Sequence, residues 1–123
     1  MDLLLDFHYS DTWADPSNQN KPAAWENLSF PVLQDSVKEY TSKVIANLKS
    51  SSALPDLVQV GNEIDNGMLW PDGGIDSSEQ SWEKLTTLIK AGISGVKQEE
   101  DLPIMIHAAT GGDSSKSLYS STE

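Results

Sequence analysis

The residues best suited to chemistry in this sequence are Asn62 and Glu63, which end an apolar run that begins at Leu57. A loop rich in glycine, tryptophan and proline follows at once, so the run reads as a buried strand with this pair at its carboxyl end. In parallel α/β folds, ligands bind at that end of the strands. Glu63 could exchange a proton with a bound substrate, and the Asn62 amide could both donate to and accept from a hydroxyl group. The alternative is that Glu63 is an ordinary exposed loop carboxylate.

Two histidines also fall at the ends of expected strands. His8 ends the run 3–8 and His107 ends the run 103–107, and they are the only histidines in the chain. Each could be a hydrogen-bonded structural residue, but their shared placement favours a site at one edge of a sheet. No His-x-x-x-His or His-Glu-x-x-His spacing is present, so we expect no metal site and no cofactor.

The four tryptophans lie outside the expected strands. Trp13, Trp25 and Trp70 fall in or beside loops, whereas Trp82 fits a helical stripe and is expected in the core. A loop tryptophan can pack the loop down, or it can offer a flat apolar face to a sugar ring.

The elements that must position these residues alternate along the chain. Apolar residues recur at spacings of three and four from Leu33 to Leu48 and again from Trp82 to Val96, which predicts two amphipathic helices between the three strands. The order strand, helix, strand, helix, strand implies parallel strands with right-handed crossovers. Long loops follow the strands and short ones precede them, as in a (β/α) barrel. No Gly-x-Gly-x-x-Gly motif supports a dinucleotide-binding sheet.

Composition excludes several partners. The chain of 123 residues carries 8 Lys and Arg against 19 Asp and Glu, a formal net charge of −11, which disfavours nucleic acid and anionic membranes. There is no cysteine, so disulfides and thiolate metal sites are excluded. The length suggests one domain at most. The chain enters a strand almost immediately and finishes without a closing element, so we expect residues 1–123 to be a partial domain cut at both ends.

Three long motifs resemble a known family. They are 4–16 (LLDFHYSDTWADP), 58–64 with 66–71 (VQVGNEI and NGMLWP), and 104–107 (IMIH). Together they are similar to the motifs of glycoside hydrolase family 53, the arabinogalactan endo-β-1,4-galactanases. Among the members of that family, the sequence most resembles the fungal type. The match runs through essentially the whole chain.

The resemblance implies an α/β fold, part of a TIM (β/α)8 barrel from about strand three to strand five with the two intervening helices. It implies that Glu63 is the general acid/base of a retaining glycosidase and that Asn62 binds the sugar at the cleavage site. His8 and His107 would line the cleft, with Trp13 and Trp70 near the substrate groove. It also implies a secreted, monomeric enzyme acting on pectic galactan.

Such an enzyme needs a second carboxylate as nucleophile. In the family this is a glutamate that ends the seventh strand, which this chain does not reach. We therefore expect the chain alone to be inactive and unstable, because a three-strand piece of a barrel leaves open sheet edges. Two alternatives stay open: a non-catalytic carbohydrate-binding relative that has lost the nucleophile, and an unrelated parallel α/β domain.

Overall fold

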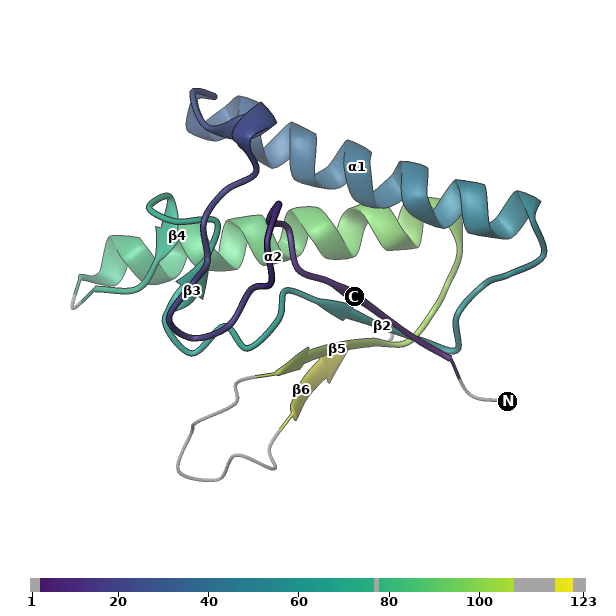
Figure 1. Cartoon of the computed structure of the whole chain (residues 1–123). Helices are drawn as coiled ribbons and strands as arrows, with labels where there is room; N and C mark the ends of the chain where they lie inside the picture. Colours follow the sequence, from purple (N-terminus) through teal and green to yellow (C-terminus); the bar gives the residue numbers. More distant parts are fainter. Residues whose placement is uncertain (1–2, 77, 108–116, 121–123) are drawn as a thin grey trace.

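The computed structural model describes residues 3–76, 78–107 and, for the backbone, 117–120 (Figure 1). Its main elements are listed in chain order: β1 (Leu4–Phe7), α1 (Phe30–Ser50), β2 (Leu57–Val60), α2 (Glu79–Glu99) and β5 (Ile104–His107). Strand β1 is parallel to β2, and β2 is parallel to β5. The predicted alternation of parallel strands and crossover helices is therefore confirmed.

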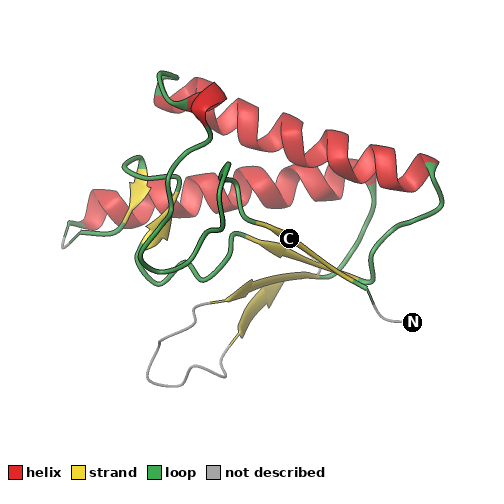
Figure 2. Ribbon diagram, viewed as in Figure 1, coloured by secondary structure: helices red, strands yellow, loops and turns green. Residues whose placement is uncertain are grey.

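The two helices cover the same face of the sheet (Figure 2). Beneath them lie buried strand residues such as Phe7, Val60 and Ile104, each at most 5% exposed. Side chains alternate between faces along a strand, so the opposite face of the sheet carries Asp6, Gln59 and Met105. These three residues are neighbours across the strands, since Asp6 is in register with Gln59 and Gln59 is in register with Met105. The sheet thus has one apolar face against the helices and one face that bears polar side chains toward the carboxyl ends.

Helix α1 buries Leu33 and Val37 as predicted, but from Tyr40 onward its buried stripe is shifted by one residue from the predicted one. Thr41 and Ile45 are fully buried, whereas Tyr40 is 48% exposed. The reason is a hydrogen bond of 2.7 Å between the Tyr9 hydroxyl, just after β1, and Thr41 Oγ1. Burial raises the pKa of Tyr9 well above its usual range, so this hydroxyl stays neutral and ties α1 to the end of the strand.

Helix α2 begins at an N-cap and approaches its neighbours through glycines. The Ser78 hydroxyl accepts a hydrogen bond from the Ser81 amide. A Cβ on Gly92 would lie 2.8 Å from Val60 Cγ1, and one on Gly95 would lie 2.5 Å from the Lys38 carbonyl oxygen, so both close approaches require glycine. The expectation that Trp82 lies in the core is wrong, because its side chain is 56% exposed.

Three short strands were not expected from the sequence. The loop after β2 folds into an antiparallel pair, β3 (Gly67–Met68) and β4 (Gly73–Gly74). Strand β6 (Ser117–Ser120) pairs antiparallel with β5, so the sheet order is β1-β2-β5-β6. Strands β3 and β4 are two residues long and mostly glycine, and the Ser-Leu-Tyr-Ser sequence of β6 does not alternate, so no period-two pattern could reveal them.

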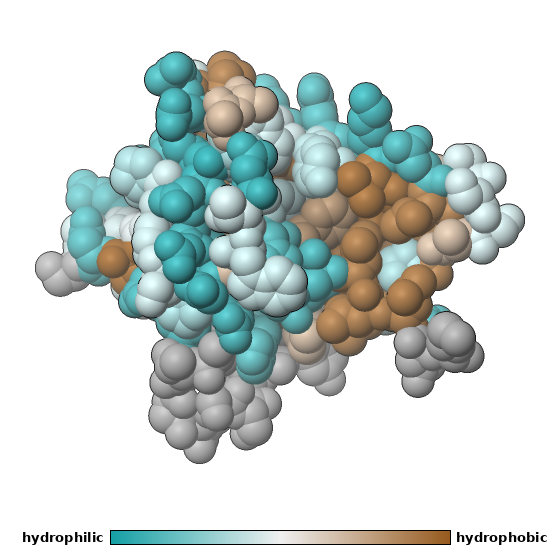
Figure 3. Space-filling view, in the orientation of Figure 1, coloured by the Kyte–Doolittle hydropathy of each residue, from teal (hydrophilic) through white to brown (hydrophobic). Residues whose placement is uncertain are grey.

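The polarity of the surface changes from one end of the strands to the other. Figure 3 shows mostly polar surface over the loops at the carboxyl ends and an apolar area toward the amino ends. Leu3 and Leu4, at the start of the edge strand β1, are about half exposed. No helix in the described part of the chain is long and apolar enough to cross a membrane.

Candidate active site

Glu63 stands on a sharp turn directly after β2. The chain leaves the strand through Gly61, whose φ is 81°, and Glu63 itself has a φ of 49°. A Cβ on Gly61 would lie 2.8 Å from Ile64 Cγ2 and 3.0 Å from Met68 Sδ, so only glycine fits the start of the turn. The turn leaves the Glu63 side chain half-buried at the carboxyl edge of the sheet.

Asp6 and His8 form a pair beside this turn. His8 Nδ1 accepts a hydrogen bond of 3.0 Å from the Ala14 amide, which leaves the ring proton on Nε2, 3.3 Å from Asp6 Oδ2. Burial raises the pKa of Asp6, the His8 imidazole opposes the rise, and the negative charge of Glu63 adds to it. The effect of Glu63 on Asp6 shows that the two carboxyl groups share one region.

His107 completes this group from the end of β5. Its imidazole acts electrostatically on Asp6, and its backbone carbonyl accepts a hydrogen bond of 3.3 Å from the Ile64 amide. We call Asp6, His8, Glu63 and His107 the strand-end group. The structure therefore brings together three predicted residues and adds Asp6, which sequence reasoning missed. Its place two residues before His8, on the same strand face, was the available signal.

Asn62 is buried rather than open to the cleft. Its Nδ2 donates to the Ala14 carbonyl over 2.7 Å, and its Oδ1 accepts from Gln59 Nε2 over 3.2 Å. The side chain is 8% exposed. One N–H and one lone pair of the amide remain beyond these two bonds. Its expected contact with a sugar stays a prediction, and its structural role is the part that the geometry shows.

The loops after β1 and β2 are joined to each other. We call residues 8–29 the first loop and residues 61–76 the second loop. Besides the bond from Asn62 Nδ2, the loops are joined by Asn66 Nδ2 to the Pro16 carbonyl (2.9 Å), the Trp70 amide to the Gln19 carbonyl (2.7 Å) and Lys21 Nζ to Asp72 Oδ1 (2.6 Å). Gln19 Nε2 adds contacts to the carbonyl oxygens of Asn62 (2.7 Å) and Glu63 (3.2 Å). The two loops consequently form one structural unit above the strand ends.

The tryptophans divide between this surface and loop packing. Trp13 is 75% exposed and contacts the His8 ring edge-on, with the ring centroids 4.9 Å apart. Trp25 packs against Tyr9 and Tyr40. Trp70 lies against the β3–β4 hairpin, and its Nε1 donates to the Asn66 carbonyl over 3.0 Å. Trp13 is thus the tryptophan placed beside the strand-end group.

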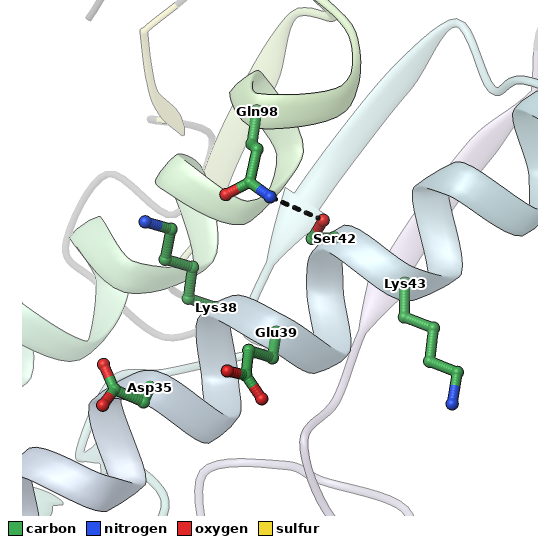
Figure 4. Close-up of a pocket in the computed structure, with 6 residues that line it drawn as sticks. All are labelled: Asp35, Lys38, Glu39, Ser42, Lys43 and Gln98. Carbon is green, nitrogen blue, oxygen red and sulfur yellow. Dashed lines mark hydrogen bonds between the residues drawn. The ribbon is translucent and has the colours of Figure 1, made fainter.

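A separate hollow lies on the outer surface of the helices (Figure 4). It is lined by Asp35, Lys38, Glu39, Ser42, Lys43 and Gln98. Only Gln98 comes from α2, and its Nε2 donates to Ser42 Oγ over 3.4 Å. The hollow contains no residue from a strand end, which separates it from the strand-end group. Across the described residues, no three His, Asp or Glu side chains are grouped so that they could hold a metal ion.

Comparisons with known proteins agree on one family. The family model described as glycosyl hydrolase family 53 matches residues 1–123. A protein from the bgaB 5′ region of Niallia circulans is 52% identical over 94% of this chain and 33% of its own length. A probable arabinogalactan endo-beta-1,4-galactanase A of Aspergillus terreus is 37% identical over 97% of this chain and 34% of its own length.

Solved structures give the same answer. The Ignisphaera aggregans GH53 catalytic domain superposes on 87% of this chain with a TM-score of 0.80 and 49% identity, and the match covers 29% of that domain. A fungal beta-1,4-galactanase superposes on 88% with a TM-score of 0.80 and 34% identity, over 32% of its chain. The predicted fold class, part of a (β/α)8 barrel, is confirmed.

The chain spans about a third of the length of the relatives that it matches. The chain is 52% and 49% identical to the Niallia circulans and Ignisphaera aggregans proteins, and 37% and 34% identical to the Aspergillus terreus protein and the fungal galactanase.

Proposed function

Because the chain belongs to glycosyl hydrolase family 53, we propose that the protein carrying it hydrolyses β-1,4-galactosidic bonds in galactan and arabinogalactan. Relatives from Aspergillus terreus and Thermothelomyces thermophilus carry galactanase names. The observation that supports the proposal most directly is Glu63, held half-buried on a fixed turn at the carboxyl end of β2 beside Asp6, His8 and His107. A polymeric substrate does not cross membranes, so we infer that the enzyme acts outside the cell.

In the proposed mechanism Glu63 is the general acid/base. It protonates the glycosidic oxygen as the bond to the anomeric carbon breaks, and it then removes a proton from the water that hydrolyses the covalent intermediate. Trp13 supplies an exposed aromatic face for a galactose ring, and His8 and His107 line the cleft beside it. Asn62 is proposed to use its remaining N–H toward a sugar hydroxyl.

The nucleophile must be a second carboxylate about 5–5.5 Å from Glu63. In the described part of the chain, no other glutamate ends a parallel strand, because the others lie on helices or loops. We therefore propose that residues 1–123 form three consecutive strand units of a barrel whose remaining strands supply the nucleophile. No metal or cofactor enters this mechanism.

Replacing Glu63 by Gln in the full-length polypeptide tests the assignment. We expect kcat/KM on β-1,4-galactan to fall by about 10²- to 10⁴-fold, because the amide cannot deliver a proton. The loss of kcat/KM should be far smaller on an aryl β-galactobioside, whose leaving group departs without protonation. Glu83→Gln, an exposed carboxylate on α2, is the matched control and should behave like the unmodified protein. Full galactan cleavage by the Glu63→Gln variant would refute the assignment.

A further inference from the structure

We propose that Gln19 is a positioning residue for Glu63: its buried amide binds the two carbonyl groups that fix the turn on which Glu63 stands. The inference rests on the proposed function, since it concerns the direction in which the acid/base carboxyl points. Gln19 lies in the first loop, 44 residues before Glu63, and no sequence motif identified it.

The contacts of Gln19 converge on the turn. Its Nε2 lies 2.7 Å from the Asn62 carbonyl oxygen and 3.2 Å from the Glu63 carbonyl oxygen. The same nitrogen lies 3.1 Å from the Asp15 carbonyl oxygen. The side chain is 1% exposed, so water does not compete for this donor. Two consecutive peptide units are therefore bound by a single amide group.

The turn needs such support because of its backbone conformation. Glu63 has a φ of 49°, a left-handed backbone conformation that residues other than glycine rarely adopt. Residues in such conformations persist where the surrounding structure holds them, and they are found frequently at active sites. In the left-handed conformation, the orientation of the peptide unit sets where the Glu63 side chain points. Gln19 fixes that orientation.

The two ends of the Gln19 amide differ: Nε2 makes the hydrogen bonds, and Oε1 makes none with the described residues. Gln59 holds the beginning of the turn from the sheet side, with its Nε2 3.0 Å from the Gly61 carbonyl oxygen. The Gln19 backbone is itself held by the Trp70 amide. By contrast, Gln19 Oε1 is buried and meets no donor among the described residues. A buried amide with one unpaired end is unfavourable, so the hydrogen bonds of Nε2 are what stabilise this side chain in its buried position.

Gln19→Met in the full-length polypeptide is the test, because methionine has nearly the same length and removes the donor together with Oε1, which has no partner among the described residues. We expect kcat/KM on β-1,4-galactan to fall roughly 10- to 100-fold, the scale of a misplacement of about 1 Å at a reacting group. On an aryl β-galactobioside, which needs no proton donor, the fall should be less than about threefold. Gln19→Asn, which keeps a buried amide but is too short to reach both carbonyls, should show the same preferential loss.

Asn66→Ala is the matched control. Asn66 also joins the two loops through its side-chain amide, 2.9 Å from the Pro16 carbonyl oxygen, but it does not touch the Glu63 peptide. We expect this variant to cleave both substrates like the unmodified protein. A control that lost galactan activity selectively would contradict the role assigned to Gln19.

The remaining outcomes separate the two proposals. If the unmodified protein cleaves galactan and Glu63→Gln abolishes this, but Gln19→Met is fully active or loses both substrates equally, the inference about Gln19 is wrong. Loss of folding in both Gln19 variants would likewise reduce Gln19 to a structural role and overturn it. If the unmodified protein does not cleave galactan, the proposed function itself fails.

Discussion

Replacing Asn62 by Ala tests whether the turn that carries Glu63 is held by buried hydrogen bonds or only shaped by the strand. The substitution leaves the carbonyl oxygen of Ala14, a residue that is 0% exposed, without its 2.7 Å donor. It also removes the acceptor of one Gln59 N–H, while the bond from Gln59 to the Gly61 carbonyl remains. The variant therefore creates one fully unpaired buried acceptor and one half-satisfied buried donor.

The expected cost follows from these two groups. A buried polar group left unpaired costs about 1–3 kcal/mol, and a single net hydrogen bond contributes about 1 kcal/mol. Together they predict a fall of about 2–4 kcal/mol in the free energy of unfolding, a large part of the 5–15 kcal/mol that is typical of folded proteins. In a domain about three times the length of this chain, this corresponds to a Tm about 3–5 °C lower.

The assay is thermal unfolding of the full-length polypeptide, followed at one fixed scan rate, together with galactan hydrolysis well below both transitions. Asn66→Ala serves as control, because the Asn66 side chain is exposed and its loss should lower Tm by no more than about 2 °C. An Asn62→Ala variant that melts like the unmodified protein would refute the structural role. Loss of hydrolysis with an unchanged Tm would show that Asn62 acts on the sugar alone.

Two further predictions concern helix packing and the pH dependence of stability. Gly95→Ala should lower the free energy of unfolding by about 1–2 kcal/mol, because overpacking against the Lys38 carbonyl exceeds the gain of about 1 kcal/mol in helix propensity. Urea unfolding measures this change. The control variant Ser94→Ala, at an exposed position of the same helix, should not be less stable than the unmodified protein. Asp6→Asn should become more stable relative to the unmodified protein as pH rises. Because burial raises the pKa of Asp6, its contribution is fully present below 3.8 and is lost as pH rises through the folded-state value. A stability difference that is constant between pH 4 and pH 7 would contradict this sign.

The sequence predicted the parts of the fold that depend on periodicity. Alternating apolar runs and helical stripes are local patterns, so the parallel strands, both helices and the placement of Glu63 at a strand end could be predicted from them. The phase of α1 could not, because Thr41 is buried through a hydrogen bond to Tyr9, which lies 32 residues earlier. Trp82 was placed wrongly for a related reason, since the close approach that sets the buried face of α2 is made by Gly92 and Gly95.

The site shows the same limit more clearly. His8, His107 and Glu63 could be singled out because each lies at the end of a strand, and strand ends can be predicted from the sequence. Asp6 lies inside a strand, and it became a candidate only when the structure placed it near enough to Glu63 for the Glu63 charge to raise the pKa of Asp6. Gln19 carries no local signal at all, because its importance comes from two carbonyl groups more than 40 residues away.

The first loop stabilises the turn that carries Glu63, and this has a consequence for how the candidate site assembles. Strand β2 ends at Val60, and beyond it Glu63 depends on contacts from Ala14 and Gln19. The first loop in turn is attached to the second through the Lys21–Asp72 ion pair, whose side chains are only 8% and 16% exposed. The second loop also packs Ile64, Met68 and Leu69 into the core, whereas the peptide of Glu63 is bound from the first loop by Gln19. The position of Glu63 should therefore be lost or kept together with the first loop, even though the strand below it is fixed independently by the sheet and the helices.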